Sequence, residues 1–166
     1  MNYRGSRAKG AAFFFTVVTE HRRRIFSSFE NINLIGLALD HVKGKHPFQM
    51  DAFVILPDHI HCIWTMPEGI DDFSTRWRLV KSYFTKKCLT NGKIWQDRYW
   101  GHQIRDEDDF TRHVEYTHYN PVKHGYARSP IEWEHSSFRE FVKKDIYQPD
   151  WGAGKCIQFD SMVGSE

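Results

Sequence analysis

Residues 49–66, QMDAFVILPDHIHCIWTM, decide the fold of this chain. Two runs rich in β-branched and aromatic residues, 49–56 and 59–66, flank the dipeptide Pro57-Asp58. Such runs are typical of strands, and proline followed by aspartate favours a turn between them. The stretch therefore predicts a β-hairpin.

The second strand of this hairpin carries two histidines two positions apart. Successive side chains of a strand point to opposite faces, so His59 and His61 should project on one side, with Ile60 and Cys62 on the other. Two imidazoles placed in this way can share one cation. The alternative is a pair of surface or hydrogen-bonded histidines without a metal. Cys62 faces the wrong way to be a third ligand.

The segments around the hairpin alternate between strand and helix patterns. Apolar residues spaced by three and four predict amphipathic helices, and β-branched or aromatic runs predict strands. The expected elements are a strand at 12–19, a helix at 29–45, a helix at 72–89, a short strand within 94–104 and a helix from about 107 to 119.

This order predicts an α+β fold with a ferredoxin-like βαββαβ core, an antiparallel sheet and an added C-terminal helix. The length of 166 residues and the 40% hydrophobic composition suit one domain with one core. We expect a single domain over 1–166, with its core at about 10–126. The C-terminal extension at about 127–166 looks irregular and should wrap the domain.

Cysteine usage and the N-terminus bear on the compartment. The three cysteines form no CxxC pair, so a reduced, cytoplasmic protein is the simplest interpretation. Basic residues precede the apolar run 11–18, as in a signal peptide, but His21 and three arginines follow where a small-residue cleavage site should be. We therefore expect no export and no membrane association.

A second group of polar residues lies in the last predicted helix. Tyr116 and Asn120 are four residues apart and should share a face. Because Asn120 precedes Pro121, regular helix is expected to end there. Helix termination explains residues 120–125 well, but it gives no reason for Tyr116.

Together these segments resemble the Y1 transposase group of HUH endonucleases, in particular the REP-associated tyrosine transposases related to the IS200/IS605 enzymes. The most specific matches are LPDHIHCIW at 56–64, where His-hydrophobic-His is the HUH signature, and Tyr116 followed by YNPVKHG at 119–125. Further similarity covers nearly the whole chain in one order, at 10–17, Trp77-Arg78, Trp95-Gln96 with Arg98, and Asp150-Trp151-Gly152.

The resemblance implies that Tyr116 is the catalytic nucleophile and that His59 and His61 are metal ligands. In relatives the third ligand, usually Gln, lies four residues after the tyrosine. The matching residue here is Asn120, which is one methylene shorter. The resemblance also implies nicking and strand transfer of single-stranded DNA through a 5′-phosphotyrosine, with palindromic hairpin repeats as substrate. Mg²⁺ or Mn²⁺ is the expected cation.

Basic and aromatic side chains are the expected DNA contacts, although the net charge is only +2. By themselves the basic clusters are better explained as a solvated surface patch. Trp95, Tyr99 and Trp100 are candidates for stacking on unpaired bases. The candidate DNA-binding residues are Arg4, Arg7, Lys9, Arg22, Arg23, Arg24, Trp95, Arg98 and Lys123.

Two other functions remain open from the residues alone. One is a non-catalytic module that binds single-stranded nucleic acid, since ferredoxin-like folds often serve as binding platforms. The other is a metal-dependent nuclease that uses an activated water, with Tyr116 structural. The resemblance to REP-associated transposases implies a monomer rather than a homodimer, and the long C-terminal segment suits this.

Overall fold

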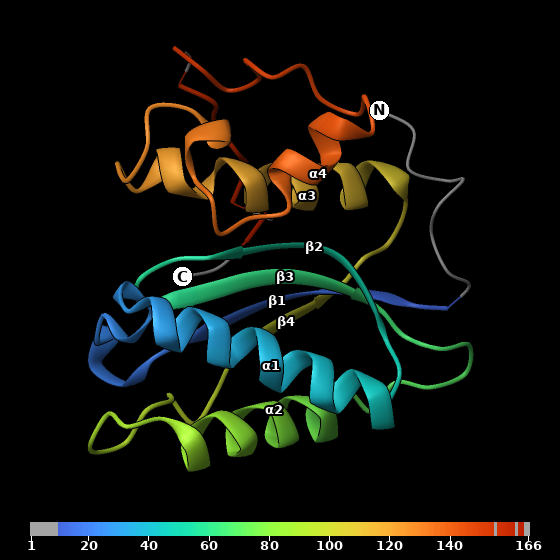
Figure 1. Cartoon of the computed structure of the whole chain (residues 1–166). Coiled ribbons are helices and arrows are strands. Elements are labelled where there is room, and N and C mark those ends of the chain that lie inside the picture. Colours follow the sequence, from blue (N-terminus) through green and yellow to red (C-terminus); the bar gives the residue numbers. More distant parts are fainter. Residues whose placement is uncertain (1–9, 155, 162, 165–166) are drawn as a thin grey trace.

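The computed structural model describes residues 10–154, 156–161 and 163–164. Its centre is one four-stranded antiparallel sheet in the order β2-β3-β1-β4, which confirms the predicted ferredoxin-like topology (Figure 1). The strands are β1 (Ala12–Val18), β2 (Gln49–Ile55), β3 (His59–Thr65) and β4 (Trp100–Gln103).

The predicted hairpin is formed by β2 and β3. Ile55 pairs with Ile60, and the Leu56 N–H donates to the His59 carbonyl at 2.8 Å to close the turn. On its other side β3 pairs with β1, so that His61 lies opposite Thr16. Every residue of β3 is buried, because helices cover both faces of the sheet.

Two helices, α1 (Phe29–Lys45) and α2 (Phe73–Lys87), cover one face (Figure 1). The Ser28 hydroxyl caps α1 by accepting from the Asn31 N–H, as serine often does at a helix start. Aromatic rings fill the space between these helices and the sheet. Trp64 of β3 stacks on Trp77 of α2, with ring centroids 4.4 Å apart.

The opposite face is covered by α3 (Glu107–Lys123), α4 (Phe138–Lys143) and the C-terminal segment (Figure 1). The C-terminal extension therefore wraps the domain as expected, but it is not wholly irregular, because α4 and a short 3-10 turn interrupt it. Within the described ranges, no helix combines the length and the apolar character needed to cross a membrane.

Helix α3 is longer than predicted. The Asp106 side chain accepts from the Asp109 N–H at its start, and acidic residues fill the first turn, where they complement the helix dipole. The expected end at Asn120-Pro121 is wrong, since α3 continues to Lys123. Proline removes only one backbone donor so close to the end, and the Pro121 carbonyl accepts from the Tyr126 N–H at 2.8 Å.

Candidate active site

The two histidines of β3 lie side by side on the α3 face of the sheet. His59 and His61 are 1% and 0% exposed, and their ring centroids are 4.8 Å apart. The Thr16 hydroxyl lies 2.9 Å from Nδ1 of His61, across the β1–β3 pairing. Strand alternation thus places both imidazoles where they can act together.

Asp58, in the hairpin turn, orients the first of these rings. Its Oδ1 lies 2.6 Å from Nδ1 of His59, and its Oδ2 accepts from Nη1 of Arg22 at 3.2 Å. Burial would raise the pKa of Asp58, but the hydrogen bonds and charges of His59 and Arg22 outweigh it and leave the pKa lowered. An ionised carboxylate accepts the Nδ1 proton, so Nε2 of His59 carries the lone pair that a metal needs.

Helix α3 brings Tyr116 to these histidines. The Tyr116 and His61 ring centroids are 5.4 Å apart, and the rings meet edge to face. Phe14 packs against both, at 6.0 Å from Tyr116 and 5.5 Å from His61. On the other side, Nζ of Lys123 donates to the phenolic oxygen at 3.0 Å. The phenol therefore lies between an imidazole and an ammonium group.

Asn120 lies one helical turn after Tyr116 and is fully buried. Its amide nitrogen donates to the Tyr116 carbonyl at 3.4 Å, whereas its Oδ1 has no hydrogen-bond partner among the described residues. A buried oxygen without a partner costs free energy, so it suggests a ligand. Two imidazole nitrogens and one amide oxygen form a donor set that suits a divalent cation.

The C-terminal segment covers Tyr116, whose side chain is only 3% exposed. Phe159 meets its ring at a centroid distance of 5.4 Å, and a Cβ at Gly164 would lie 2.3 Å from it. The Tyr119 hydroxyl accepts from the Ile157 N–H at 3.2 Å and helps to hold this segment. A cavity of about 560 Å³ remains between α3 and the segment, with Tyr116 and Lys123 in its lining.

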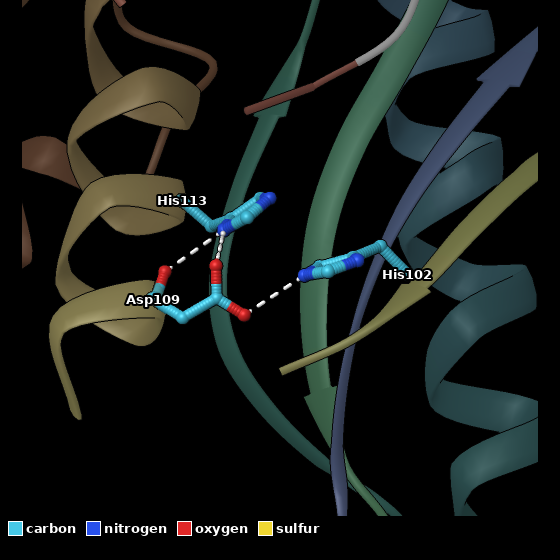
Figure 2. A group of neighbouring side chains, drawn as sticks. All are labelled: His102, Asp109 and His113. Atoms are coloured by element: carbon cyan, nitrogen blue, oxygen red, sulfur yellow. Dashed lines mark hydrogen bonds and ion pairs between the residues drawn. The ribbon is translucent and has the colours of Figure 1, made fainter. Parts of the chain in front are cut away.

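A second polar cluster, which the sequence analysis missed, joins β4 to the start of α3 (Figure 2). Oδ2 of Asp109 lies 2.8 Å from Nε2 of His102, and Oδ1 lies 3.2 Å from Nδ1 of His113. The ring centroids of the two histidines are 4.7 Å apart. One ligand atom from each residue lies within 4.8 Å of the others, so the group has the composition of a metal site.

The charges around this cluster oppose a cation. Arg105 and Arg112 approach the Asp109 carboxylate at 3.4 and 4.0 Å. Burial would raise the pKa of Asp109, but hydrogen bonds from Arg105 and His102 lower it to about 2. Nδ1 of His113 lies 2.8 Å from the Asp109 backbone carbonyl, which positions its proton there. The cluster thus links β4 to α3 through hydrogen bonds and ion pairs, although Oδ1 of Asp109 and Nε2 of His113 form no hydrogen bond among the described residues.

The predicted DNA-binding residues are widely spread. Arg4, Arg7 and Lys9 lie outside the described residues. Arg23 donates to the Lys93 carbonyl at 3.1 Å, and Arg24 lies over the Tyr126 ring at 5.6 Å. Arg22 forms an ion pair with Asp58, and Lys123 donates to the Tyr116 hydroxyl. Arg98 is exposed. Among the described candidates, Arg22 contacts Asp58 beside His59 and Lys123 contacts Tyr116, whereas Arg24 lies farther out, at Tyr126.

Trp95 is not available for stacking on DNA, so this prediction is wrong. It is 6% exposed and packs between Phe26 and Phe84, at centroid distances of 5.8 and 5.3 Å. The segment between α2 and β4 pairs with the end of β1 through a bridge between Trp95 and Thr19, and this carries the ring into the core. Tyr99 and Trp100 are half-buried.

Sequence reasoning also missed the partners of the histidines. His124 was interpreted only as a helix-end residue, yet its ring lies 5.1 Å from that of His59. Asp58 was interpreted only as a turn residue. An acidic residue directly before a histidine was the available signal for its orienting contact, whereas nothing local pointed to His124.

Comparisons with known proteins agree with this geometry. No protein-family profile matches the sequence. The chain is 43% identical over 160 residues to the REP-associated tyrosine transposase of Escherichia coli K12, covering 96% of this chain and 94% of the relative. A solved structure of a REP-associated tyrosine transposase bound to a REP hairpin is 40% identical, with a TM-score of 0.83, and covers 100% of this chain and 98% of that chain.

Proposed function

This chain belongs to the REP-associated tyrosine transposases, and we propose that it nicks and rejoins REP-type hairpin DNA with Tyr116 as the nucleophile. One observation carries the residue assignment. The Tyr116 phenol of α3 lies against the His61 imidazole of β3, 5.4 Å between ring centroids, although 55 residues separate them in the chain. Helix packing alone does not require a phenol beside two buried imidazoles.

The covalent step follows from this placement. The phenolic oxygen of Tyr116 attacks the phosphorus, a new O–P bond forms, and the bond from phosphorus to the 3′ oxygen breaks. The phenol gives up its proton and the departing 3′ oxygen takes one up, so the products are a free 3′ hydroxyl and a 5′ phosphate on the tyrosine. Lys123, 3.0 Å from the phenolic oxygen, stabilises the negative charge that develops there. Because the phosphodiester bond energy is kept, a later 3′ hydroxyl can reverse the step.

His59, His61 and Asn120 are the residues that would hold the divalent cation, either Mg²⁺ or Mn²⁺. Such a cation supplies Lewis-acid polarisation of a non-bridging phosphate oxygen and orients the scissile bond. The unpartnered Oδ1 of Asn120 and the oriented imidazole of His59 support this assignment. The arginines beside the Asp109 carboxylate disfavour a cation in the other cluster.

A monomeric enzyme is consistent with this site. The phenol on α3 and the imidazoles on β3 come from one chain, so no second copy is needed to complete the group. DNA must still reach a tyrosine that is only 3% exposed. Residues 156–161 and 163–164 therefore have to move away from α3 before a phosphodiester can meet the phenolic oxygen.

The test is covalent capture of labelled DNA. Wild type and Tyr116→Phe are incubated with a labelled single-stranded hairpin and Mn²⁺ or Mg²⁺, then separated under denaturing conditions. A covalent band is expected with wild type and none with Tyr116→Phe, a loss of at least about a thousandfold because the nucleophile is absent. Tyr119→Phe is the matched control, since it removes a neighbouring phenol that contacts Ile157 and should keep the band.

Two results would contradict the proposal. Cleavage that survives Tyr116→Phe would indicate a nuclease that activates water. Binding without cleavage by either protein would indicate a non-catalytic nucleic-acid-binding module.

A further inference from the structure

A row of rings leads outward from His59, and we call His124, Tyr126 and Trp133 the ring row. The His124 centroid lies 5.1 Å from that of His59 and 6.0 Å from that of Tyr126. Tyr126 and Trp133 follow at 5.7 Å, with their planes only 30° apart. The ring row is thus continuous with the histidine pair and extends away from it.

The ring row is held in place and partly open. Each of its three side chains is half-buried, unlike the fully buried rings of the two cores. The Trp133 indole N–H donates to the Ile55 carbonyl at 3.1 Å, and the Tyr126 N–H donates to the Pro121 carbonyl at 2.8 Å. These bonds connect the ring row to the end of β2 and to the end of α3, so its rings need little ordering when a ligand binds.

The charge beside the ring row suits an anionic ligand. The Arg24 guanidinium lies over the Tyr126 ring at 5.6 Å from its centroid and is exposed. Glu132, also nearby in sequence, is paired with Arg128 at 3.3 Å, which reduces its repulsion of an anion. Glu134 is the remaining exposed acid of this segment. Arg24 therefore supplies a cation directly at the aromatic surface.

We propose that the ring row and Arg24 bind the unpaired nucleotides next to the scissile phosphate. This inference rests on the proposed function and deepens it, because the ring row begins beside His59, one of the proposed metal ligands. Unpaired bases stack on aromatic rings, and an arginine beside the rings can contact the phosphates that link them. Bases within a duplex are already stacked on one another and cannot use such a surface.

The other layer of the molecule offers a matched control. Tyr83 of α2 is also half-buried, stacks on His41 at 4.7 Å and has the Lys87 ammonium 5.0 Å from its centroid. It therefore has the same chemistry of tyrosine, histidine and cation as Tyr126. It lies in the α1–α2 layer, on the opposite side of the sheet from His59 and His61 (Figure 1).

The test compares two DNA probes in the Tyr116→Phe background, which prevents cutting. One probe is a hairpin with a single-stranded extension, and the other is the same hairpin with a blunt end. Tyr126→Ala should weaken binding of the extended hairpin about tenfold. It should change binding of the blunt hairpin less than about twofold. Tyr126→Phe, which keeps the ring, and Tyr83→Ala should both bind the extended hairpin like the parent protein.

A second measurement needs no change to the ring row. Fluorescence of 2-aminopurine placed in the extension should be quenched on binding, whereas the same base in the hairpin stem should not respond. Unchanged fluorescence in the extension, or an equal loss of both probes in Tyr126→Ala, would overturn the inference. These readouts measure binding only, so a wild-type protein that forms no covalent adduct would refute the proposed function separately.

Discussion

The two faces of one sheet differ sharply in what they bury. On the α1–α2 face, β3 contributes Ile60, Cys62 and Trp64 to a core of apolar and aromatic side chains. On the α3 face, the alternate residues of the same strand include His59 and His61. Adjacent residues of β3 therefore serve different purposes, since one face stabilises the domain and the other carries the proposed chemistry.

The α3 face buries polar groups that a structural core would avoid. His61, His113, His118 and Asn120 are each 0% exposed. Burying a polar group costs free energy unless its hydrogen bonds are satisfied. Those of His118 are satisfied by Tyr147 and Ser137, whereas Oδ1 of Asn120 has no partner among the described residues, which suggests a ligand there. Desolvation lowers the pKa of His118 to about 3. The α1–α2 face has a buried thiol instead, where burial raises the pKa of Cys62.

The largest expected effect comes from removing an imidazole on the α3 face. His61→Ala should lower the rate of DNA cutting about a thousandfold or more, because a metal ligand is lost. DNA affinity should stay within about threefold, since most phosphate contacts lie elsewhere. Single-turnover cleavage and a binding titration measure the two quantities. His41→Ala, on α1, is the control. Equal loss of cutting and binding would show that His61 is structural.

The next effect concerns the residue that orients His59. Asp58→Asn removes the charge that holds the Nδ1 proton of His59 and breaks the ion pair with Arg22. Mn²⁺ binding, followed by calorimetry without DNA, should weaken about 10- to 100-fold. Asp97→Asn removes a surface carboxylate that pairs only with Lys93 among its described ion pairs, and it should leave Mn²⁺ binding unchanged. Similar affinities for wild type and Asp58→Asn would mean that Asp58 only shapes the turn.

A smaller effect is expected in the dependence of stability on pH. The pKa of His118 is about 3 in the folded protein and near 6.5 when unfolded, so below pH 6.5 the unfolded state takes up a proton that the folded state excludes. This residue should make the free energy of unfolding fall by about 1 kcal/mol for each pH unit below 6.5, and the fall should level off as the pH approaches the lowered pKa. His118→Asn should be less stable at neutral pH, but its chemical denaturation should show a flatter pH dependence. His21→Asn, which changes an exposed ring, is the control. If wild type, His118→Asn and His21→Asn all show the same dependence of stability on pH, the pH effect does not come from His118.

The smallest effect tests the other face at the residue between the two histidines. Ile60 is 1% exposed and belongs to the α1–α2 core. Ile60→Val should lower the free energy of unfolding by about 1 kcal/mol, from lost packing, and leave the cutting rate within about twofold. Urea denaturation measures the free energy of unfolding, and single-turnover cleavage measures the cutting rate. A large loss of cutting with unchanged stability would show that the α1–α2 face also takes part in the chemistry.

Most of the fold could be predicted from the sequence. The periodicity of α1 and the alternation of β2 and β3 are local signals, and the structure follows them closely. The errors arose where tertiary packing decides. Pro121 lies within α3, one turn before its end, where the loss of one backbone donor is tolerated. Trp95 is buried because its loop packs against the α1–α2 core.

The site was only partly predictable. His59, His61, Tyr116 and Asn120 carry motif signals and share faces that periodicity reveals. Their partners do not, because contacts such as His59 with His124 join segments far apart in the chain. The link of His102 to Asp109 was hidden for the same reason, as no local pattern relates a residue of β4 to one in the first turn of α3.

The position of the bound cation tests the account most directly. A crystal of the Tyr116→Phe protein soaked in Mn²⁺ would reveal the ion by its anomalous scattering. We expect a peak coordinated by His59, His61 and Asn120. A peak within the group formed by His102, Asp109 and His113, with none between β3 and the end of α3, would contradict the assignment.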